Sequence, residues 1–264
     1  MSTLSYALTD SATMLRRQLR HMLRYPGLTV QLALMPIIFL LLFVYVFGGT
    51  LGNGIGGGSG GRDAYVNYVV PGILMMMVAL GATGTAISVS MDMTQGIIAR
   101  FRTMAIARVS VLTGHVVGSM IQTMLGCGLV TVAALLVGFD PNATAVEWIV
   151  VAGVLAMITF ALTWLCVALG LAAKTVESAS NTPTPLTILP FLGSGFVPTD
   201  SMPGWLRVFA DYQPFTPIME TIRGLLLGTG IGNSGVVSIA WCAGIALVSY
   251  IWAKKLFNRD PAGK

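Results

Sequence analysis

The sequence predicts an all-α integral membrane protein with six transmembrane helices, and its composition carries most of that prediction. Apolar residues make up 55% of the 264 positions and charged residues only 9%, whereas soluble domains carry roughly 25% charged residues. Mean hydropathy is +0.81. The apolar residues gather into runs of about 20, the length at which a helix crosses a bilayer. The net charge of +5 does not indicate a nucleic-acid partner, because the basic residues lie in separate clusters that flank these runs.

The first predicted element is an amphipathic helix over residues 4–24, lying in the plane of the membrane surface. Apolar residues recur along one side and basic residues occupy the other, a pattern that favours the headgroup region. The apolar side holds Leu4, Leu8, Leu15, Leu19 and Met22, and the basic side holds Arg16, Arg17, Arg20, His21 and Arg24. Pro26 ends the helix, because proline disfavours helical backbone in the residue before it. We expect residues 1–27 to form a cytoplasmic interfacial helix ahead of a six-span domain over residues 28–264.

Two spans joined by a glycine-rich tract come next. The first span covers about Leu28–Phe47, with Pro36 as an expected kink, and the second covers about Tyr65–Ser90. The tract between them, residues 48–63, invites comparison with a phosphate-binding loop, but it has no Gly-Lys-Ser/Thr ending. We interpret it as a flexible extracytoplasmic connector. Met75–Met77 in the second span fit either an adaptable ligand surface or core packing.

The third and fourth spans are predicted at about Val109–Phe139 and Val146–Ala172. The turn between them, residues 140–142, holds no basic residue, which is typical of an extracytoplasmic connection. All three cysteines fall inside predicted spans, and no C-x-x-C pattern indicates a metal site. We interpret Cys127, Cys166 and Cys242 as buried thiols.

The segment after the fourth span is broken by prolines. Residues 182–197 hold Pro183, Pro185 and Pro190 and end in a Gly-Ser-Gly sequence. Backbone broken in this way cannot face lipid, because its free polar groups would have no partner there. We therefore expect an irregular fifth span that enters the bilayer against protein.

Two short helices are predicted next, at about Met202–Tyr212 and Ile218–Leu227. Each is too short to cross a bilayer, and an Arg or Asp at mid-membrane costs roughly 2.5–3.5 kcal/mol. Their charged residues are Arg207, Asp211, Glu220 and Arg223. We expect an extracytoplasmic re-entrant helix pair within residues 198–232, followed by a last span at about Val236–Phe257.

The stretch Asp92–Arg108 is the one substantial charged interruption between the second and third spans. At helical spacing its apolar residues share one face and Arg100 and Arg102 lie largely off it, the pattern of a short amphipathic helix. The apolar face holds Ile97, Ile98, Phe101, Met104 and Ala105. The alternative is an ordinary basic loop that only orients the spans.

The basic residues also predict the orientation of the chain. Twelve of the fifteen Lys and Arg residues lie on one side of the predicted topology, in residues 1–27, 91–108, 173–181 and 254–264. The other three are Arg62, Arg207 and Arg223. Basic residues accumulate on the cytoplasmic side, so both termini and Asp92–Arg108 are expected in the cytoplasm.

The predicted spans contain no Asp, Glu, Lys or Arg away from their ends. Ion-coupled transporters usually keep such groups in the membrane as proton or ion relays. His21 and His115 each stand alone in the sequence, and we interpret them as satisfied interfacial histidines, with a ligand role as the alternative. No Ser-His-Asp set or H-E-x-x-H motif occurs. If the protein drives transport uphill, the energy must come from another chain.

Four stretches covering nearly half the chain resemble the ABC type-2 transporter permeases (the type V ABC exporter fold), close to the daunorubicin/doxorubicin-resistance permease group of actinobacteria. They follow the order of the family and are residues 16–49, 65–93, 92–115 and 192–224. The last, LGSGFVPTDSMPGWLRVFADYQPFTPIMETIRG, is the most specific. The chain departs from the family at Ala105, where a proline is common, and at residues 97–99, where acidic residues are frequent.

The resemblance implies a dimer of six-span permeases, formed with a second copy or a paralogue and joined to two cytoplasmic ABC ATPase subunits. ATP and Mg²⁺ would be bound by those subunits, so this chain would bind no cofactor and would not itself be an enzyme. Asp92–Arg108 would be the coupling helix, with Phe101 as its apolar anchor. The residues expected to contact the ATPase are Gly96, Arg100, Phe101, Arg102, Thr103 and Arg108, with Arg16 and Arg20 of the N-terminal helix.

The resemblance also implies an exit gate, a substrate path and a function. The gate would comprise Gly193, Gly195, Phe196, Pro198, Pro203, Trp205, Pro214, Pro217 and Arg223, and the path Met75, Met76, Trp164 and Phe191. The function would be export of amphipathic drugs or lipids through the bacterial cytoplasmic membrane, as in multidrug efflux and antibiotic resistance. The alternatives are export of a polysaccharide or lipid-linked glycan by the same fold, and a passive channel or ion-coupled carrier.

Overall fold

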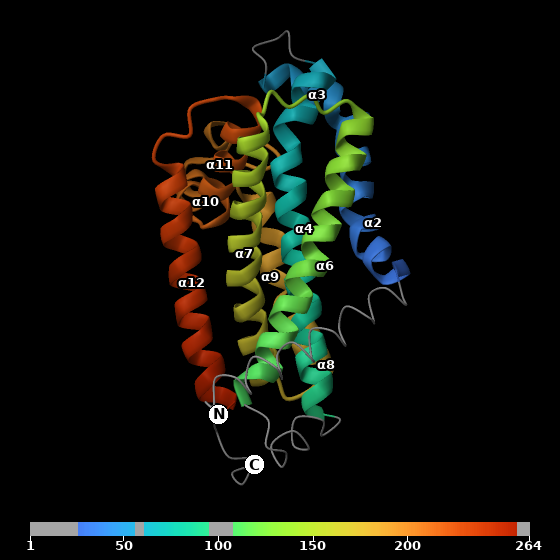
Figure 1. The fold of residues 1–264 in the computed structure, drawn as a ribbon. Coiled ribbons are helices and arrows are strands. Elements are labelled where there is room, and N and C mark those ends of the chain that lie inside the picture. Colours follow the sequence, from blue (N-terminus) through green and yellow to red (C-terminus); the bar gives the residue numbers. More distant parts are fainter. Residues whose placement is uncertain (1–25, 56–60, 95–107, 258–264) are drawn as a thin grey trace.

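The computed structural model describes residues 26–55, 61–94 and 108–257, and every regular element in these ranges is a helix. Five helical segments are long and apolar enough to cross a membrane by length and composition, and they run side by side from one end of the molecule to the other (Figure 1). They are Thr29–Gly54, Gly61–Thr94, Leu112–Val137, Ala145–Ala172 and Ser234–Phe257. This is the architecture of a multi-pass integral membrane protein.

The bundle has two distinct ends. The lower end is where α4 (Gly61–Thr94) ends and α6 (Arg108–Val137) begins, and the upper end holds the turn between α6 and α7 (Ala145–Ala172) (Figure 1). The last helix, α12 (Ser234–Phe257), runs along α7. Helices α4, α7 and α12 contain the predicted second, fourth and last spans, and α6 contains the predicted third span except for its last two residues. The structure therefore has a helix long and apolar enough to cross a membrane at each of these four positions.

Helix α4 is the centre of the bundle. In its most apolar 18-residue window, 72% of the residues are buried within the chain, against 22% for α12 and for the first span. It packs against α6 and α7 on one side and against the short helices of the later chain on the other. The outer helices therefore leave apolar side chains exposed, as expected for surfaces that face lipid or a second subunit.

The first span is longer than predicted. Helix α2 (Pro26–Leu42), with Pro36 inside it, passes into a π-helical turn, η1 (Phe43–Phe47), and then into α3 (Gly48–Ile55). The prediction of a flexible connector over residues 48–63 is therefore wrong for residues 48–55 and for residues 61–63, which begin α4. Residues 56–60 lie outside the described residues.

Packing against α4 explains why this glycine-rich tract is helical. A Cβ on Gly52 would lie 1.7 Å from the carbonyl oxygen of Gly61, so only glycine lets α3 approach the start of α4 this closely. The Arg62 guanidinium lies over the Tyr45 ring, 4.0 Å from its centroid. These contacts outweigh the helix penalty of about 1 kcal/mol that each glycine carries.

The predicted fifth span is a series of short helices instead of one. They are α8 (Val176–Asn181), α9 (Thr184–Ile188) and the 3₁₀ turn η2 (Leu189–Leu192). All three pack against α4. The first of them, α8, lies near the lower end of the bundle (Figure 1). Pro183 precedes α9 and Pro190 lies in η2, so the prolines divide this segment as the sequence predicted.

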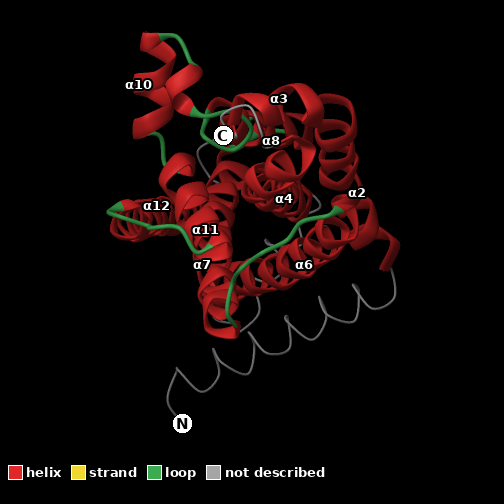
Figure 2. Ribbon diagram, turned by 90° about the horizontal axis from the view of Figure 1, so that it is seen from above, coloured by secondary structure: helices red, strands yellow, loops and turns green. Residues whose placement is uncertain are grey.

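Two further short helices, α10 (Gly204–Tyr212) and α11 (Phe215–Leu227), lie at the upper end. Their existence is confirmed, but α11 begins three residues earlier than predicted. Pro217 falls in its first turn, where a missing N–H leaves no hydrogen bond unmade. Gly228, at φ +69°, ends α11 in the left-handed conformation. Seen from above, α10 projects from the bundle whereas α11 packs into it (Figure 2).

Candidate functional site

The turn after η2 lies directly on the backbone of α4. A Cβ on Gly72 would lie 2.7 Å from the carbonyl oxygen of Gly195, and a Cβ on Gly195 would lie 3.0 Å from Gly72 Cα and 2.7 Å from Met219 Sδ. Two glycines on different elements thus permit backbone-to-backbone contact. Of the two turn glycines predicted to belong to the exit gate, Gly195 lies against the central helix, whereas a Cβ on Gly193 would meet Gln213, Met219 and Thr216.

Arg223 ties three elements together at this turn. Its Nη2 donates to the carbonyl oxygens of Tyr68 on α4 (3.2 Å) and Ser194 in the turn (2.5 Å), and its Nε donates to Tyr68 O (3.4 Å). The guanidinium also lies 3.8 Å from the centroid of the Tyr68 ring. Burial lowers the pKa of Arg223, although an arginine stays charged at any pH at which proteins are handled.

An aromatic cluster lies beside the contacts that Arg223 makes with α4 and the turn. The rings of Phe191 and Phe196 stack with centroids 4.4 Å apart and planes 7° apart, and Phe43 from the first span reaches Phe196 at 4.8 Å. The Tyr65 hydroxyl donates to the Phe196 carbonyl oxygen (3.2 Å). The cluster joins the first span, α4 and the turn, so Phe196 and Phe191 occupy one compact site.

Polar side chains fill the remaining space beneath the turn. Gln213 Nε2 donates to the Leu189 carbonyl oxygen (3.2 Å), and the Ser194 amide donates to Thr216 Oγ1 (3.4 Å). Gln213 Oε1 and Ser194 Oγ are buried and have no hydrogen-bond partner within the described part of the chain. With Arg223, these groups make a polar patch inside an otherwise apolar end of the bundle.

The other predicted gate residues lie on, or just before, the short helices that follow the turn. Pro198 precedes a 3₁₀ turn, η3 (Thr199–Ser201), Pro203 precedes α10, and Pro214 precedes α11. Trp205 lies on the projecting α10 with 78% of its surface exposed. The predicted set is therefore two groups: an internal cluster around Arg223, and the surface helix α10 with its approaches.

The first and last residues of the predicted coupling segment, Asp92 and Arg108, lie at the lower end. Asp92 lies near the end of α4 and Arg108 begins α6, while residues 95–107 and the N-terminal helix lie outside the described residues. Gly96, Arg100, Phe101, Arg102 and Thr103 therefore stay predictions, as do Arg16 and Arg20.

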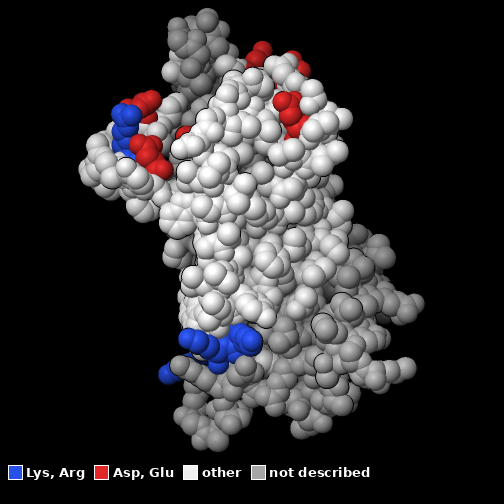
Figure 3. Space-filling view, turned by 60° about the vertical axis from the view of Figure 1, so that its left-hand side comes forward, with Lys and Arg blue, Asp and Glu red and all other residues white. Residues whose placement is uncertain are grey.

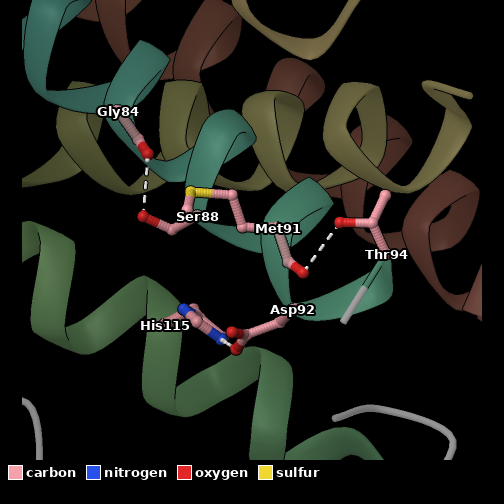
Figure 4. A network of polar contacts seen from close by, with 6 residues as sticks. All are labelled: Gly84, Ser88, Met91, Asp92, Thr94 and His115. Carbon is pink, nitrogen blue, oxygen red and sulfur yellow. Dashed lines mark hydrogen bonds and ion pairs between the residues drawn. The ribbon is translucent and has the colours of Figure 1, made fainter. Parts of the chain in front are cut away.

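The interpretation of His115 as a satisfied interfacial histidine is confirmed, but its partner was not identified from the sequence. The His115 Nε2 lies 2.9 Å from Asp92 Oδ2 (Figure 4), so the interfacial histidine has a carboxylate partner. A signal was present: a carboxylate ending one span and a histidine beginning the next must meet at the same end of an antiparallel helix pair. Tyr68 and Ser194, the partners of Arg223, were also missed, because backbone carbonyls leave no mark in a sequence.

The four residues predicted to line a substrate path lie on three different elements. Met75 and Met76 are buried on α4, and Trp164 is buried on α7 with its ring 5.0 Å from that of Tyr250. Phe191 belongs to the aromatic cluster at the upper end. For the methionines, this placement favours the packing alternative over a ligand surface.

Charge divides between the two ends (Figure 3). Lys174 follows α7, and Lys254 and Lys255 lie in the last turn of α12, all at the lower end. The upper end holds carboxylates on either side of the α6–α7 turn and around α10, where Arg207 is paired with Asp200 and Asp211. The lower end also holds Asp92 and Glu177, and the upper end also holds Arg223. Within the described residues the separation of charge is therefore partial, with the lysines at the lower end as the positive-inside pattern expects.

The close contact at Gly72 makes a testable prediction. Gly72→Ala would force α4 and the 193–196 turn apart, and such overpacking costs about 1–3 kcal/mol. Gly84→Ala is the matched control on the same helix, because a Cβ there has no heavy atom within 4 Å. In thermal unfolding of the purified protein, Gly72→Ala should lower the midpoint and Gly84→Ala should leave it unchanged or raise it. Equal unfolding midpoints for the two variants would contradict the close contact between α4 and the 193–196 turn.

Comparisons with known proteins were consistent with this architecture. Residues 10–227 match the sequence profile of the family described as "ABC-2 type transporter". A daunorubicin resistance ABC transporter permease protein, DrrB1 of Streptomyces coeruleorubidus, is 27% identical over 259 residues, covering 97% of this chain and 88% of the relative. A probable doxorubicin resistance ABC transporter permease protein, DrrC of Mycobacterium tuberculosis (strain CDC 1551 / Oshkosh), is 27% identical over 194 residues, covering 70% and 67%.

Proposed function

Because this chain belongs to the ABC-2 type transporter family, among relatives of the daunorubicin- and doxorubicin-resistance permeases, we propose that it is the membrane subunit of an exporter of amphipathic compounds. ATP would be hydrolysed by a separate ABC subunit that also holds Mg²⁺. The named relatives are permease proteins, which supports a chain that contributes the pathway and not the ATPase. Two ATPase subunits and a second permease would complete the assembly.

The observation that carries this proposal is the uncharged interior of a bundle with charges gathered at its ends. The predicted spans hold no Asp, Glu, Lys or Arg away from their ends, and such groups are what ion-coupled carriers use. An engine outside the bundle is then needed for uphill transport. Spans lined by Met, Phe, Leu and Gly suit an amphipathic substrate, because a mixed apolar surface selects weakly by shape.

The proposed topology has six crossings with both termini in the cytoplasm of a bacterial cell. Five are the long helices, and the sixth is the broken segment from α8 to η2, which packs along α4. Its freed backbone groups would be tolerated because they face protein. Residues 198–232 would form an extracytoplasmic re-entrant region, residues 1–27 an interfacial helix, and residues 92–108 the coupling helix of the domain over 28–264.

The proposal is tested in inverted membrane vesicles that contain the permease and its ATPase subunit. We expect ATP-dependent uptake of a fluorescent amphipathic drug such as daunorubicin, and no uptake when the ATPase carries an inactivating substitution. Uptake without any ATPase would contradict the proposal in favour of a channel or ion-coupled carrier. ATP-dependent movement of a lipid-linked glycan, with no drug uptake, would contradict the substrate class alone.

A further inference from the structure

The hydrogen-bonded pair of His115 and Asp92 is the first rung of a polar ladder between α4 and α6. Both side chains are largely shielded, with 17% of His115 and 19% of Asp92 exposed. The imidazole Nε2 and carboxylate Oδ2 lie 2.9 Å apart, and the two side chains point toward each other across the helix pair (Figure 4). Protonated at Nε2, the ring donates a hydrogen bond to the carboxylate whether or not it carries a net charge.

Further rungs continue upward along the same helix faces. Thr85 Oγ1 donates to Ser119 Oγ (2.6 Å), which lies 3.4 Å from the carbonyl oxygen of Gly81. Thr123 lies one turn farther along α6 and packs closely on Gly81, where a Cβ would come 2.2 Å from the Thr123 hydroxyl oxygen. This hydroxyl has no hydrogen-bond partner within the described part of the chain, so the contact is one of packing. We call these residues the α4–α6 ladder: Asp92, Thr85 and Gly81 on α4, with His115, Ser119 and Thr123 on α6.

The lowest rung differs from the ion pairs elsewhere in the described ranges. Arg207 pairs with Asp200 and Asp211 on the exposed upper surface, whereas His115–Asp92 joins two of the long helices. Stability alone does not account for it, because apolar residues of similar volume often replace a shielded ion pair without loss of stability. What a paired carboxylate adds is one defined register between the two helices.

The position of this rung relates it to the segment between the helices. Asp92 lies two residues before the last residue of α4, and His115 lies on the second turn of α6, so the contact joins the two arms beside the connecting segment 95–107. Without such a contact, a force applied to that segment could be absorbed by separating the helix bases. With it, the force moves both helices as one body.

We propose that Asp92 and His115 are positioning residues that clamp the bases of α4 and α6, so that the conformational step of the ATPase reaches the bundle through both helices together. This inference rests on the proposed function. The clamp stays closed throughout the transport cycle, and the deeper Thr85–Ser119 rung keeps the register of the two helices above it. The pair touches neither substrate nor nucleotide and acts through the connecting segment.

The test uses the complete complex of permease and ATPase in proteoliposomes and measures substrate molecules moved per ATP hydrolysed. Asp92→Ala and His115→Ala should each lower this ratio about tenfold, equivalent to about 1.4 kcal/mol, and His115→Ala should do so with basal hydrolysis unchanged. Asp92→Asn keeps an acceptor and should retain most of the ratio. The exchanged pair, Asp92→His with His115→Asp, should restore it. Arg207→Ala, which breaks the exposed pairs, is the matched control and should leave it unchanged.

Several outcomes decide between the two proposals. A wild-type complex without ATP-driven transport would overturn the proposed function. A wild-type complex that transports, with an unchanged ratio in both alanine variants, would overturn the clamp alone, as would an exchanged pair that assembles but stays uncoupled. If the alanine variants fail to assemble, spin labels at Ser88→Cys and Val117→Cys decide the question. If the distance between the label on α4 and the label on α6 stays unchanged when ATP is added, the clamp is supported. If that distance changes, the clamp is overturned.

Discussion

Phe101→Asp is expected to reduce ATP hydrolysis by the partner subunits from its substrate-stimulated rate to its basal rate. The prediction follows from the amphipathic pattern of residues 92–108, in which Phe101 is the largest residue of the apolar face. A buried aromatic anchor typically contributes 2 kcal/mol or more to an interface, and a carboxylate in its place would have to be desolvated without a partner. Contact with the ATPase, and with it the coupling, should be lost.

The measurement is the ATPase activity of the reconstituted complex with and without substrate. Phe101→Leu is the matched control, because it keeps an apolar side chain of similar size and should retain stimulation. Expression of both variants should match wild type, since the segment lies outside the spans. Full stimulation in the Phe101→Asp complex would refute the anchor role, and a loss in both variants would point to a need for the ring itself.

Arg223→Met is expected to give the largest loss of folded-state stability among substitutions at the upper end. The change removes a charged donor that holds Tyr68 on α4 and Ser194 in the turn, together with a cation–π contact. Hydrogen bonds to charged groups contribute about 1.5–3 kcal/mol each, so a loss of about 3 kcal/mol is a reasonable expectation. Without the contacts of the Arg223 side chain, the turn should separate from the central helix.

Thermal unfolding of the purified protein measures this loss. Arg223→Lys is the informative comparison, because lysine keeps the charge but cannot reach two carbonyls with a fixed planar fork. It should therefore fall between wild type and Arg223→Met. Arg207→Met is the control for removing an arginine from an exposed site, and its effect should be small, since exposed ion pairs contribute about 0–1 kcal/mol. Equal unfolding midpoints for Arg223→Met and wild type would contradict the claim that Arg223 stabilises the contact between the turn and α4.

The sequence predicted the long spans well because their physical signal is strong. A run of about 20 apolar residues has few structural alternatives to a membrane helix. Long helices therefore cover the predicted second, fourth and last spans, and all but the last two residues of the third. The prolines of residues 182–197 also indicated breaks correctly, since a proline cannot complete the helical hydrogen-bond ladder.

The glycine-rich tract shows where propensity failed. Glycine is a poor helix former, and residues 48–55 therefore read as a connector. Their helical structure depends on the close approach of Gly52 to the start of α4, a tertiary contact with no local signal. Arg223 likewise contacts residues 155 and 29 positions away in sequence, and the identity of its partners could not be predicted from spacing.

The candidate site was predictable in part for the same reasons. The Gly-Ser-Gly turn and Arg223 were both singled out, and the structure brings them together. The surface helix α10 was assigned to the same gate but lies apart from it, because the sequence does not show that its apolar residues Trp205 and Tyr212 stay exposed. The lower-end pair was missed although each residue was noted, because each was considered on its own helix.

Residues 92–108 are proposed to be a cytoplasmic coupling helix that the ATPase contacts, and thiol labelling tests this most directly. Arg100→Cys is suited to this, because the three native cysteines are buried and should give little background. A membrane-impermeant maleimide should react with this variant in inverted vesicles but not in intact cells, and added ATPase subunit should slow the reaction. Labelling from outside intact cells, or a reaction in inverted vesicles that the ATPase does not slow, would contradict the account.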